Sequence, residues 1–321
     1  MEYKYKINSY IRHLKAFLLV VLLSYSPQNW GVSVSQYPQL NKLANQLEEL
    51  NKGEGDVIRL WLEDAKIKLK IVEIMNRPSE GLPWYRYQPL FVNSSSIKSG
   101  VKFLAHHAEI LRKAEEKYGV PAEIIVAIIG IETRYGKVLG NYRVLDSLVT
   151  LSQEFPRRSK FFFSELEHFF KLAQEWSLDP LTLKGSYAGA IGIPQFMPSS
   201  YRAYAIDFNA DGRIDLVNSV DDAIGSVANY LAQHNWKADQ EIVWQTTDLP
   251  NSIADMVGEK FQPNKSVSEL RAIGINIPEL YRKVAILEFQ EKSYKAYRIV
   301  FHNFFVITRY NRSRNYALSV F

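Results

Sequence analysis

The sequence predicts a mainly helical fold of the α+β class, in which a small β-rich region follows a helical body. Apolar residues at helical spacing recur from about residue 37 to residue 236. Two later runs, 284–289 and 299–307, are rich in β-branched and aromatic residues and are typical of strands. No low-complexity linker separates the two parts, so we expect the β-rich region to pack on the helices.

Composition narrows the class of protein. The chain has 321 residues, 47% hydrophobic and 23% charged, which suits a folded soluble protein of two or three domains. The net charge of +5 is mild and lysine and arginine are scattered, so no nucleic-acid partner is expected. There are no cysteines, which excludes disulfides, cysteine nucleophiles, thiolate zinc sites and a lipid-modified cysteine.

The N-terminus predicts export. Basic residues precede the apolar run 16–23, which is too short to span a bilayer and is followed by a small-residue cleavage pattern ending at Ser35. We interpret residues 1–35 as a secretory signal peptide and expect a periplasmic protein. An uncleaved N-terminal membrane anchor is the alternative.

The helical body is predicted element by element. Residues 37–82 form polar helices, and residues 82–89 form an extended aromatic segment. The remaining predicted helices are 101–118, the run that ends at Glu132, 144–154, 159–175, 222–234 and a short helix or turn at 270–277. The predicted domains are an N-terminal helical segment with its aromatic linker (36–100), a core (101–240) and a β-rich region (241–321).

Glu132 is the leading catalytic candidate. It ends the apolar helix 121–132 and shares a face with Ile125, Ile128 and Ile129, and the opposite side is apolar too. Such surroundings desolvate a carboxylate and raise its pKa, as a general acid requires. A structural glutamate tied to Arg134 or to a backbone group would fit the same pattern.

A second candidate segment is 184–200, which is rich in small residues. Glycine and alanine let a ligand or another helix approach the backbone closely, and Ser186 and Gln195 are polar groups able to bond a substrate. No Gly-Lys-Ser/Thr ending is present, which argues against a phosphate loop. Tight helix packing alone would also explain the small residues.

A calcium loop is predicted at 207–218. Asp207, Asn209 and Asp211 occupy the first, third and fifth positions, glycine the sixth, and the Arg213 carbonyl the seventh. The twelfth position is asparagine instead of the usual glutamate, so the last ligand would be Asp221 or Asp222. Oxygen ligands favour calcium, which would clamp the loop; a plain Asp/Asn turn is the alternative.

Two further segments carry polar and charged groups. Arg157 and Arg158 lie at a predicted helix start, able to grip anionic or peptide carboxylate groups, unless they are simply solvated. The segment 309–316 combines polar and aromatic residues, including Tyr310, Asn311 and Tyr316. Both carbohydrate contact and chain-end packing fit it.

Together these segments resemble the lytic murein transglycosylase B family. The resemblance runs from about residue 60 to residue 321, and its motifs are specific in order and spacing. They are Pro-Trp-Tyr-Arg-Tyr at 83–87, Gly-Ile-Glu-Thr-Arg-Tyr-Gly at 130–136, Phe-Pro-Arg-Arg at 155–158, Ser-Tyr-Ala-Gly-Ala-Ile-Gly at 186–192, Gln-Phe-Met-Pro-Ser at 195–199, the loop from Asp207 with Ile-Gly-Ser-Val-Ala-Asn-Tyr at 224–230, and Thr-Arg-Tyr-Asn at 308–311 with Tyr316.

The resemblance implies a lysozyme-like helical core with an additional helical domain and a small β domain. It implies cleavage of the bond between N-acetylmuramic acid (MurNAc) and N-acetylglucosamine (GlcNAc) in peptidoglycan, with a 1,6-anhydro product and Glu132 as the single acid/base. The substrate N-acetyl group would assist. The resemblance places Ser186, Gln195, Tyr310, Asn311 and Tyr316 near the acid and Tyr87, Arg157 and Arg158 along the cleft. Asp207, Asn209, Asp211, Arg213 and Asp221 would bind structural calcium.

The sequence departs from the family pattern in two respects, and two alternative functions stay open. Family members anchored in the membrane carry a lipidated cysteine that this chain lacks, and the doubled Asp221-Asp222 leaves the last calcium ligand open. A hydrolytic muramidase would use the same acid, and a calcium-dependent, non-catalytic cell-wall scaffold protein would need none. We expect a monomer acting on glycan strands, with other cell-wall enzymes as candidate partners.

Overall fold

The computed structural model describes residues 36–50, 54–77, 81–176, 178–244, 249–258, 260–277 and 283–321. The predicted signal peptide, 1–35, lies outside them. The chain divides into two compact units, Met1–Ile67 and Lys68–Phe321, and the predicted domain limits at 36–100, 101–240 and 241–321 remain a prediction. Within the described ranges, no helix is both long and apolar enough to cross a membrane.

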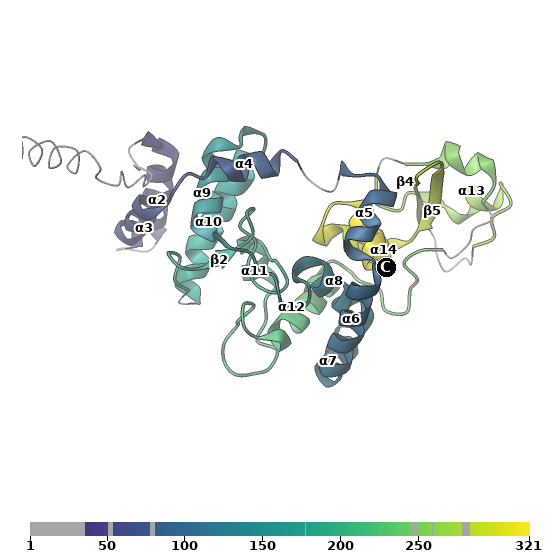
Figure 1. Cartoon of the computed structure of the whole chain (residues 1–321), viewed down its shortest axis with the longest axis horizontal. Coiled ribbons are helices and arrows are strands. Elements are labelled where there is room, and N and C mark those ends of the chain that lie inside the picture. Colours follow the sequence, from purple (N-terminus) through teal and green to yellow (C-terminus); the bar gives the residue numbers. More distant parts are fainter. Residues whose placement is uncertain are drawn as a thin grey trace, which may run out of the picture. The chain divides into compact units, whose positions relative to one another are not determined.

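The first unit contributes a helical hairpin, drawn in purple in Figure 1. Helix α2 (Pro38–Leu50) and helix α3 (Glu54–Asp64) bury facing leucine and isoleucine side chains. Gly55 allows the close approach at the turn, because a Cβ there would lie 2.7 Å from the Glu48 Cβ. The polar helices predicted for this part of the chain are confirmed.

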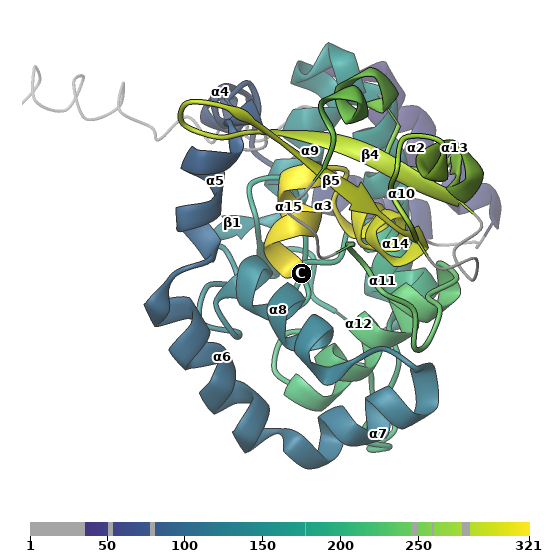
Figure 2. The same cartoon turned by 90° about the vertical axis from the view of Figure 1, so that its right-hand side faces the viewer.

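The second unit is built around helix α8 (Ala122–Thr133), which packs against α6, α7, α12 and α15. Figure 2 shows α8 among these neighbours. Its helices are α4 (Leu69–Met75), α5 (Trp84–Phe91), α6 (Ser94–His106), α7 (Ala108–Tyr118), α8, α9 (Val144–Glu154), α10 (Ser159–Glu175), α11 (Pro198–Tyr204), α12 (Val220–Gln233), α13 (Val267–Arg271), α14 (His302–Tyr310) and α15 (Arg314–Val320). The mainly helical class is confirmed.

Helices α9 and α10 have the bounds that the sequence predicts. They pack on each other, and α9 also packs on α4, so α9 is buried at every residue from Val144 to Ser152. Helix α10 is amphipathic and buries Phe162, Leu166, Phe169 and Phe170. These apolar faces stabilise the lobe by removing hydrocarbon from water.

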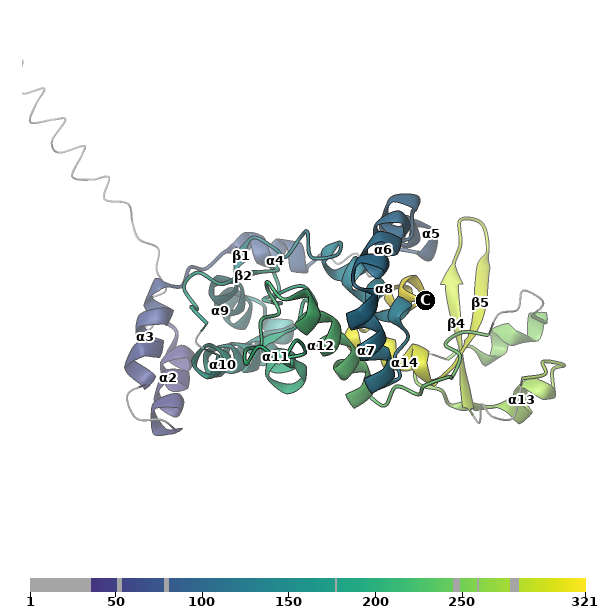
Figure 3. The same ribbon diagram turned by 90° about the horizontal axis from the view of Figure 1, so that it is seen from below.

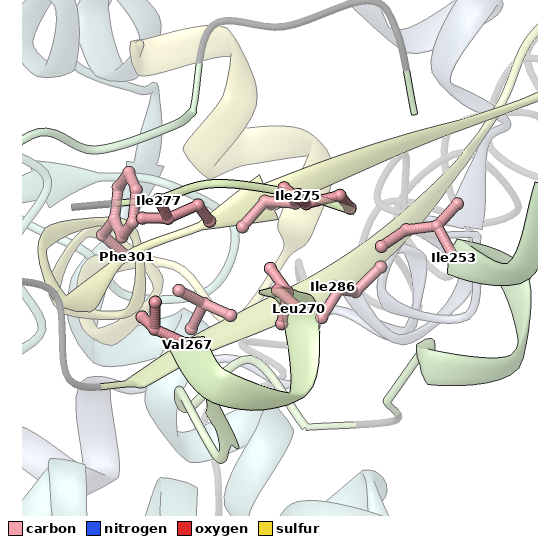
Figure 4. Close-up of a cluster of buried hydrophobic side chains, with 9 residues drawn as sticks. Ile253, Val267, Leu270, Ile275, Ile277, Ile286 and Phe301 are labelled. Carbon is pink, nitrogen blue, oxygen red and sulfur yellow. The ribbon is translucent and has the colours of Figure 1, made fainter. Parts of the chain in front are cut away.

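The β-rich region forms an antiparallel sheet of β3 (Lys265–Ser266), β4 (Lys283–Gln290) and β5 (Lys295–Val300) in that order. Figure 3 shows β4 and β5 as a long hairpin beside α13. Side chains from the sheet, from α13 and from the segment after it form a shared apolar core that includes Leu270, Ile277, Ile286 and Phe301 (Figure 4). The predicted strand 284–289 is confirmed within β4.

Two predicted elements are wrong. Residues 82–89 are not extended: Pro83 caps α5, and Trp84 and Tyr87 turn one face of that helix into the core. The run 299–307 is not one strand, because β5 ends at Val300 and α14 begins at His302. Burial on successive turns of α14 overrides the strand propensity of its β-branched and aromatic residues.

The helical pattern also misleads in two other places. The predicted helix 101–118 is divided at His107, which leaves helical geometry between α6 and α7. Phe103, Leu111 and Ala114 stay on one face across the break, so the spacing could not reveal it. Between residues 178 and 219, α11 is the one α-helix in an otherwise irregular chain with a short strand, β2 (Lys184–Gly185).

Candidate functional site

Glu132 lies in the last turn of α8, where the chain reverses sharply. Arg134, Tyr135 and Gly136 have φ values of 51°, 62° and 79°, so three successive residues adopt the left-handed region and end the helix. The Glu132 side chain is half-buried, while the neighbouring Thr133 is fully buried. The acid therefore lies at the edge of the core.

A tyrosine hydroxyl holds the carboxylate. The Tyr316 hydroxyl, on α15, donates a hydrogen bond of 2.6 Å to Glu132 Oε1. Burial, and then the charge of Glu132, raise the pKa of Tyr316 well above its ordinary value. The phenol therefore stays protonated and remains a donor to the carboxylate at every physiological pH.

Tyr310 lies parallel to Tyr316, with ring centroids 6.4 Å apart and an angle of 9° between the ring planes. Its hydroxyl donates to the Pro194 carbonyl at 2.6 Å. Burial first, then the charge of Glu132 and the electrostatic interaction with the Tyr230 phenol, raise its pKa. Among the described residues, Glu132 is the one carboxylate whose charge raises the pKa values of Tyr310 and Tyr316.

Tyr87, the third predicted tyrosine, also belongs to this group. It is buried on α5, and its electrostatic interaction with Tyr316 is a minor cause of the raised pKa of Tyr316. The structure thus places Tyr310 and Tyr316, from the consecutive helices α14 and α15, near Glu132. Tyr87 joins them through Tyr316, although α5 lies far earlier in the sequence.

The turn 191–196 lies beside the acid and carries Gln195. It is closed by paired backbone hydrogen bonds between Ile191 and Phe196. Gly192 has a φ of 74°, and a Cβ there would lie 2.3 Å from the Leu216 carbonyl oxygen, so glycine is required. Gln195 Nε2 donates to the carbonyls of Gly192 and Leu139. In the part of the chain that is described, no hydrogen bond uses Gln195 Oε1, which leaves this oxygen for a ligand.

Ser186 organises the adjoining turn. Its Oγ accepts from the backbone nitrogens of Ala188 and Ala190, at 3.3 and 3.0 Å. The small residues serve this tight turn, because a Cβ on Gly185 would lie 2.1 Å from the Ala190 carbonyl oxygen. A hydroxyl that accepts twice still has its proton to donate, so Ser186 remains able to bond a ligand.

The predicted arginines lie outside the hydrogen-bonded group around Glu132. Both are exposed in a 3₁₀ turn, η3 (Pro156–Arg158), that precedes α10. Arg157 donates to Asn76, and Arg158 stacks over the ring of Phe161, 4.3 Å from its centroid. Asn311 directly follows α14 next to Tyr310 and is half-buried.

Two residues that lie in the quoted motifs, but for which the sequence predicted no role, support the site. Thr133 Oγ1 donates to the Ile193 carbonyl at 2.9 Å and accepts from the Gly136 nitrogen, so it ties the turn 191–196 to the end of α8. Tyr230 lies 4.8 Å from Tyr310, ring to ring, and donates to the Arg309 carbonyl. The position of Thr133 directly after the acid was the sequence signal that could have predicted its role.

The predicted calcium loop is folded by its own side chains. Asp207 accepts from the nitrogens of Asp211 and Gly212, and Asp211 accepts from the nitrogen of Arg213. Among the described residues, no three His, Asp or Glu side chains form a metal cluster by themselves. A calcium loop also uses amide and backbone carbonyl oxygens, which Asn209 and Arg213 supply, and all of these donors are the hard oxygens that calcium prefers.

Asp222 braces this loop from the start of α12. It is fully buried, and its two oxygens accept from the nitrogens of Phe208, Asn209 and Asp215. Asp221 is half-buried, and its charge acts on His107. The geometry therefore makes Asp222 an anchor for the loop backbone, and the last calcium ligand stays a prediction.

A helical domain that presents one half-buried glutamate at the end of a core helix, beside a glycine-containing turn, is lysozyme-like. The chain belongs to the transglycosylase SLT domain family, whose model matches residues 35–321.

Relatives and solved structures agree with this assignment. Over 244 residues, 74% of this chain, it is 44% identical to membrane-bound lytic murein transglycosylase B of Escherichia coli (strain K12), and it spans 65% of that protein's length. The crystal structure of soluble lytic transglycosylase SltB1 from Pseudomonas aeruginosa matches with a TM-score of 0.80 and 42% identity, covering 88% of this chain and 96% of that one. Escherichia coli Slt35, in complex with calcium, matches with a TM-score of 0.79 and 37% identity, covering 90% and 92%.

Proposed function

We propose that this protein is a peptidoglycan lytic transglycosylase. It cleaves the β-1,4 bond between MurNAc and GlcNAc and leaves a 1,6-anhydromuramic acid end. The observation that carries the proposal is the half-buried Glu132 at the end of α8, held by the Tyr316 hydroxyl at 2.6 Å. Family membership and the identity to a protein named as a lytic murein transglycosylase support it.

Glu132 performs both proton transfers. Protonated Glu132 gives its proton to the glycosidic oxygen as the bond to MurNAc C1 breaks, and it becomes a carboxylate. The Tyr316 hydroxyl bonds this carboxylate more strongly than the neutral acid, so the contact tightens as charge develops. Glu132 then removes the proton of the MurNAc 6-hydroxyl, whose oxygen bonds to C1. The substrate N-acetyl group stabilises C1 between the two steps, so a second protein carboxylate is not required.

Polar groups near the acid hold the glycan. The Ser186 hydroxyl proton and Gln195 Oε1 are available to a sugar, and Asn311 adjoins Tyr310 at the end of α14. Tyr87 is buried and interacts electrostatically with Tyr316, so its proposed role is to support that tyrosine. Arg157 and Arg158 stay proposed contacts for peptide or glycan farther along the cleft.

The loop 207–218 is proposed to bind structural calcium. Asp207, Asn209, Asp211 and the Arg213 carbonyl are the ligands, with Asp221 or Asp222 as the predicted last ligand. The calcium complex of Slt35 supports this proposal. When bound, calcium would supply no chemistry to the reaction; it would neutralise the clustered carboxylates of the loop, which Asp222 already ties to α12.

The proposed location is the periplasm, reached through the signal peptide predicted at residues 1–35. The proposed substrate is the glycan strand of the cell wall, cut by a monomer. The relative's name places that protein at a membrane.

Turnover of purified sacculi by a Glu132→Gln variant tests the proposal. The change removes the transferable proton and no bulk, so we expect normal folding and nearly complete loss of product release. Glu123→Gln is the matched control, because Glu123 is an exposed glutamate in the first turn of the same helix. Unchanged turnover by the Glu132 variant would refute the enzyme and favour a calcium-dependent scaffold protein.

A further inference from the structure

An apolar pocket of about 530 Å³ lies between α5, α6, α8 and α15. Its lining includes Phe91, Leu104, Ile131 and Val320. Figure 2 shows these four helices on one side of the molecule. A mostly apolar pocket of this volume falls within the range of small-molecule and acyl-chain sites.

The pocket lies on the side of α8 away from Glu132. Val126, Ala127, Gly130 and Ile131 line it, and at about 100° per residue they share one side of the helix. Glu132 projects in roughly the opposite direction, toward Tyr316. A ligand in the pocket would leave the acid accessible to substrate.

The rim of the pocket is apolar and open to solvent. Leu90, Ile97, Val101 and Phe321 line the pocket and are 50%, 57%, 65% and 45% exposed. A small molecule bound inside would leave these side chains in water. A lipid bilayer would cover the pocket and its rim together, which favours a membrane over a free ligand.

The surroundings of the rim are basic. Arg134 lines the pocket, and the exposed Lys98 and Lys102 follow Ile97 and Val101 by one residue each on α6. No ion pair recorded among the described residues uses these three cations. Glu123 is the one acidic residue of the lining. This excess of positive charge around the rim attracts an anionic headgroup.

A buried hydroxyl inside the pocket adds a polar contact point. Ser319 lines the pocket, and its Oγ is buried without a hydrogen-bond partner. Buried hydroxyls are normally paired, so an acceptor in the pocket would satisfy this one once a small side-chain shift exposed its oxygen. The ester oxygens of a phospholipid, which lie between the acyl chain and the headgroup, are such acceptors.

We propose that this face binds an anionic membrane phospholipid. One acyl chain fills the pocket, the rim side chains enter the bilayer, and Arg134, Lys98 and Lys102 contact the phosphate. The protein would then lie on a membrane surface with Glu132 on the far side of α8, facing away from the lipid. This inference does not depend on the proposed reaction.

Site-specific fluorescence on the full-length chain tests it. The chain has no cysteines, so Val101→Cys carries a single bimane label. We expect a blue shift on adding vesicles of phosphatidylcholine and phosphatidylglycerol in equal parts, and quenching by nitroxide-labelled lipid. Tyr294→Cys is the control, because Tyr294 is similarly exposed, at 62%, but lies at the tip of the β4–β5 hairpin.

Charge removal completes the test. A Lys98→Gln, Lys102→Gln double variant should weaken the affinity of the Val101 label for anionic vesicles by about fivefold for each charge removed. An unshifted Val101 label, an equal shift at position 294, or an equal response to pure phosphatidylcholine would each overturn the proposal. Labels and glutamine substitutions lie on exposed positions, so folding should be preserved.

Discussion

Removal of one oxygen atom from Tyr316 should slow the reaction without unfolding the protein. The Tyr316 hydroxyl donates to Glu132 Oε1 at 2.6 Å, and a hydrogen bond to a charged group contributes about 1.5–3 kcal/mol. Because Glu132 gains its charge as it donates its proton, most of this energy is present in the transition state. We therefore expect Tyr316→Phe to lower kcat by about 10- to 100-fold, with little change in KM.

The assay is initial-rate release of soluble muropeptides from sacculi across a range of pH. A hydrogen bond to the carboxylate favours the ionised acid, so its loss should move the alkaline limb of the rate profile to higher pH. Tyr310→Phe is the matched control: the ring is parallel and buried, but its hydroxyl donates to the Pro194 carbonyl and not to Glu132. Equal rates and profiles for wild type and Tyr316→Phe would refute the reasoning. So would equal losses in the two variants.

Three further outcomes are expected. Gly192→Ala should lower the free energy of unfolding by about 1–3 kcal/mol, because φ is 74° and its Cβ would lie 2.3 Å from the Leu216 carbonyl oxygen. The variant should therefore unfold at a lower urea concentration, and an unchanged midpoint would contradict this. A chelator should lower the melting temperature of the wild type but not of Asp207→Ala, and identical wild-type curves with and without chelator would count against the calcium site. Burial raises the pKa of Tyr201 to about 12, so the folded state keeps a proton that the unfolded state loses near pH 10, and stability should fall between pH 10 and 12. A melting temperature constant over that interval would show this wrong.

Helices with regular apolar spacing were predictable because their burial is one-sided or complete. Helices α9 and α10 have the predicted bounds for this reason. Helix α14 was not predictable, since Phe304, Ile307 and Thr308 are buried through contacts made by the whole fold. Its local composition is typical of a strand. The break at His107 leaves no mark in the sequence, because the buried face continues across it.

The chemistry of the site was predictable where a residue is out of place locally. A glutamate at the end of an isoleucine-rich helix is such a signal, and the structure places Glu132 at the edge of the core. The contacts of Tyr316 and Ser186 differ in kind: the Tyr316 hydroxyl donates to the acid across the fold, and the Ser186 hydroxyl holds its own turn. The Tyr316 contact joins residues 184 positions apart and has no spacing that could predict it, whereas Ser186 bonds the nitrogens two and four residues on, a local turn that the small residues around it do indicate.

The mass of the released muropeptides tests the central claim most directly. The account holds that Glu132 removes the proton of the MurNAc 6-hydroxyl, whose oxygen then bonds to C1. Products from sacculi should therefore end in anhydromuramic acid and be lighter by one water than the reducing-end products of a muramidase. Wild-type digests should contain the anhydro form, and Glu132→Gln digests should contain neither. Reducing-end products from the wild type would contradict the account.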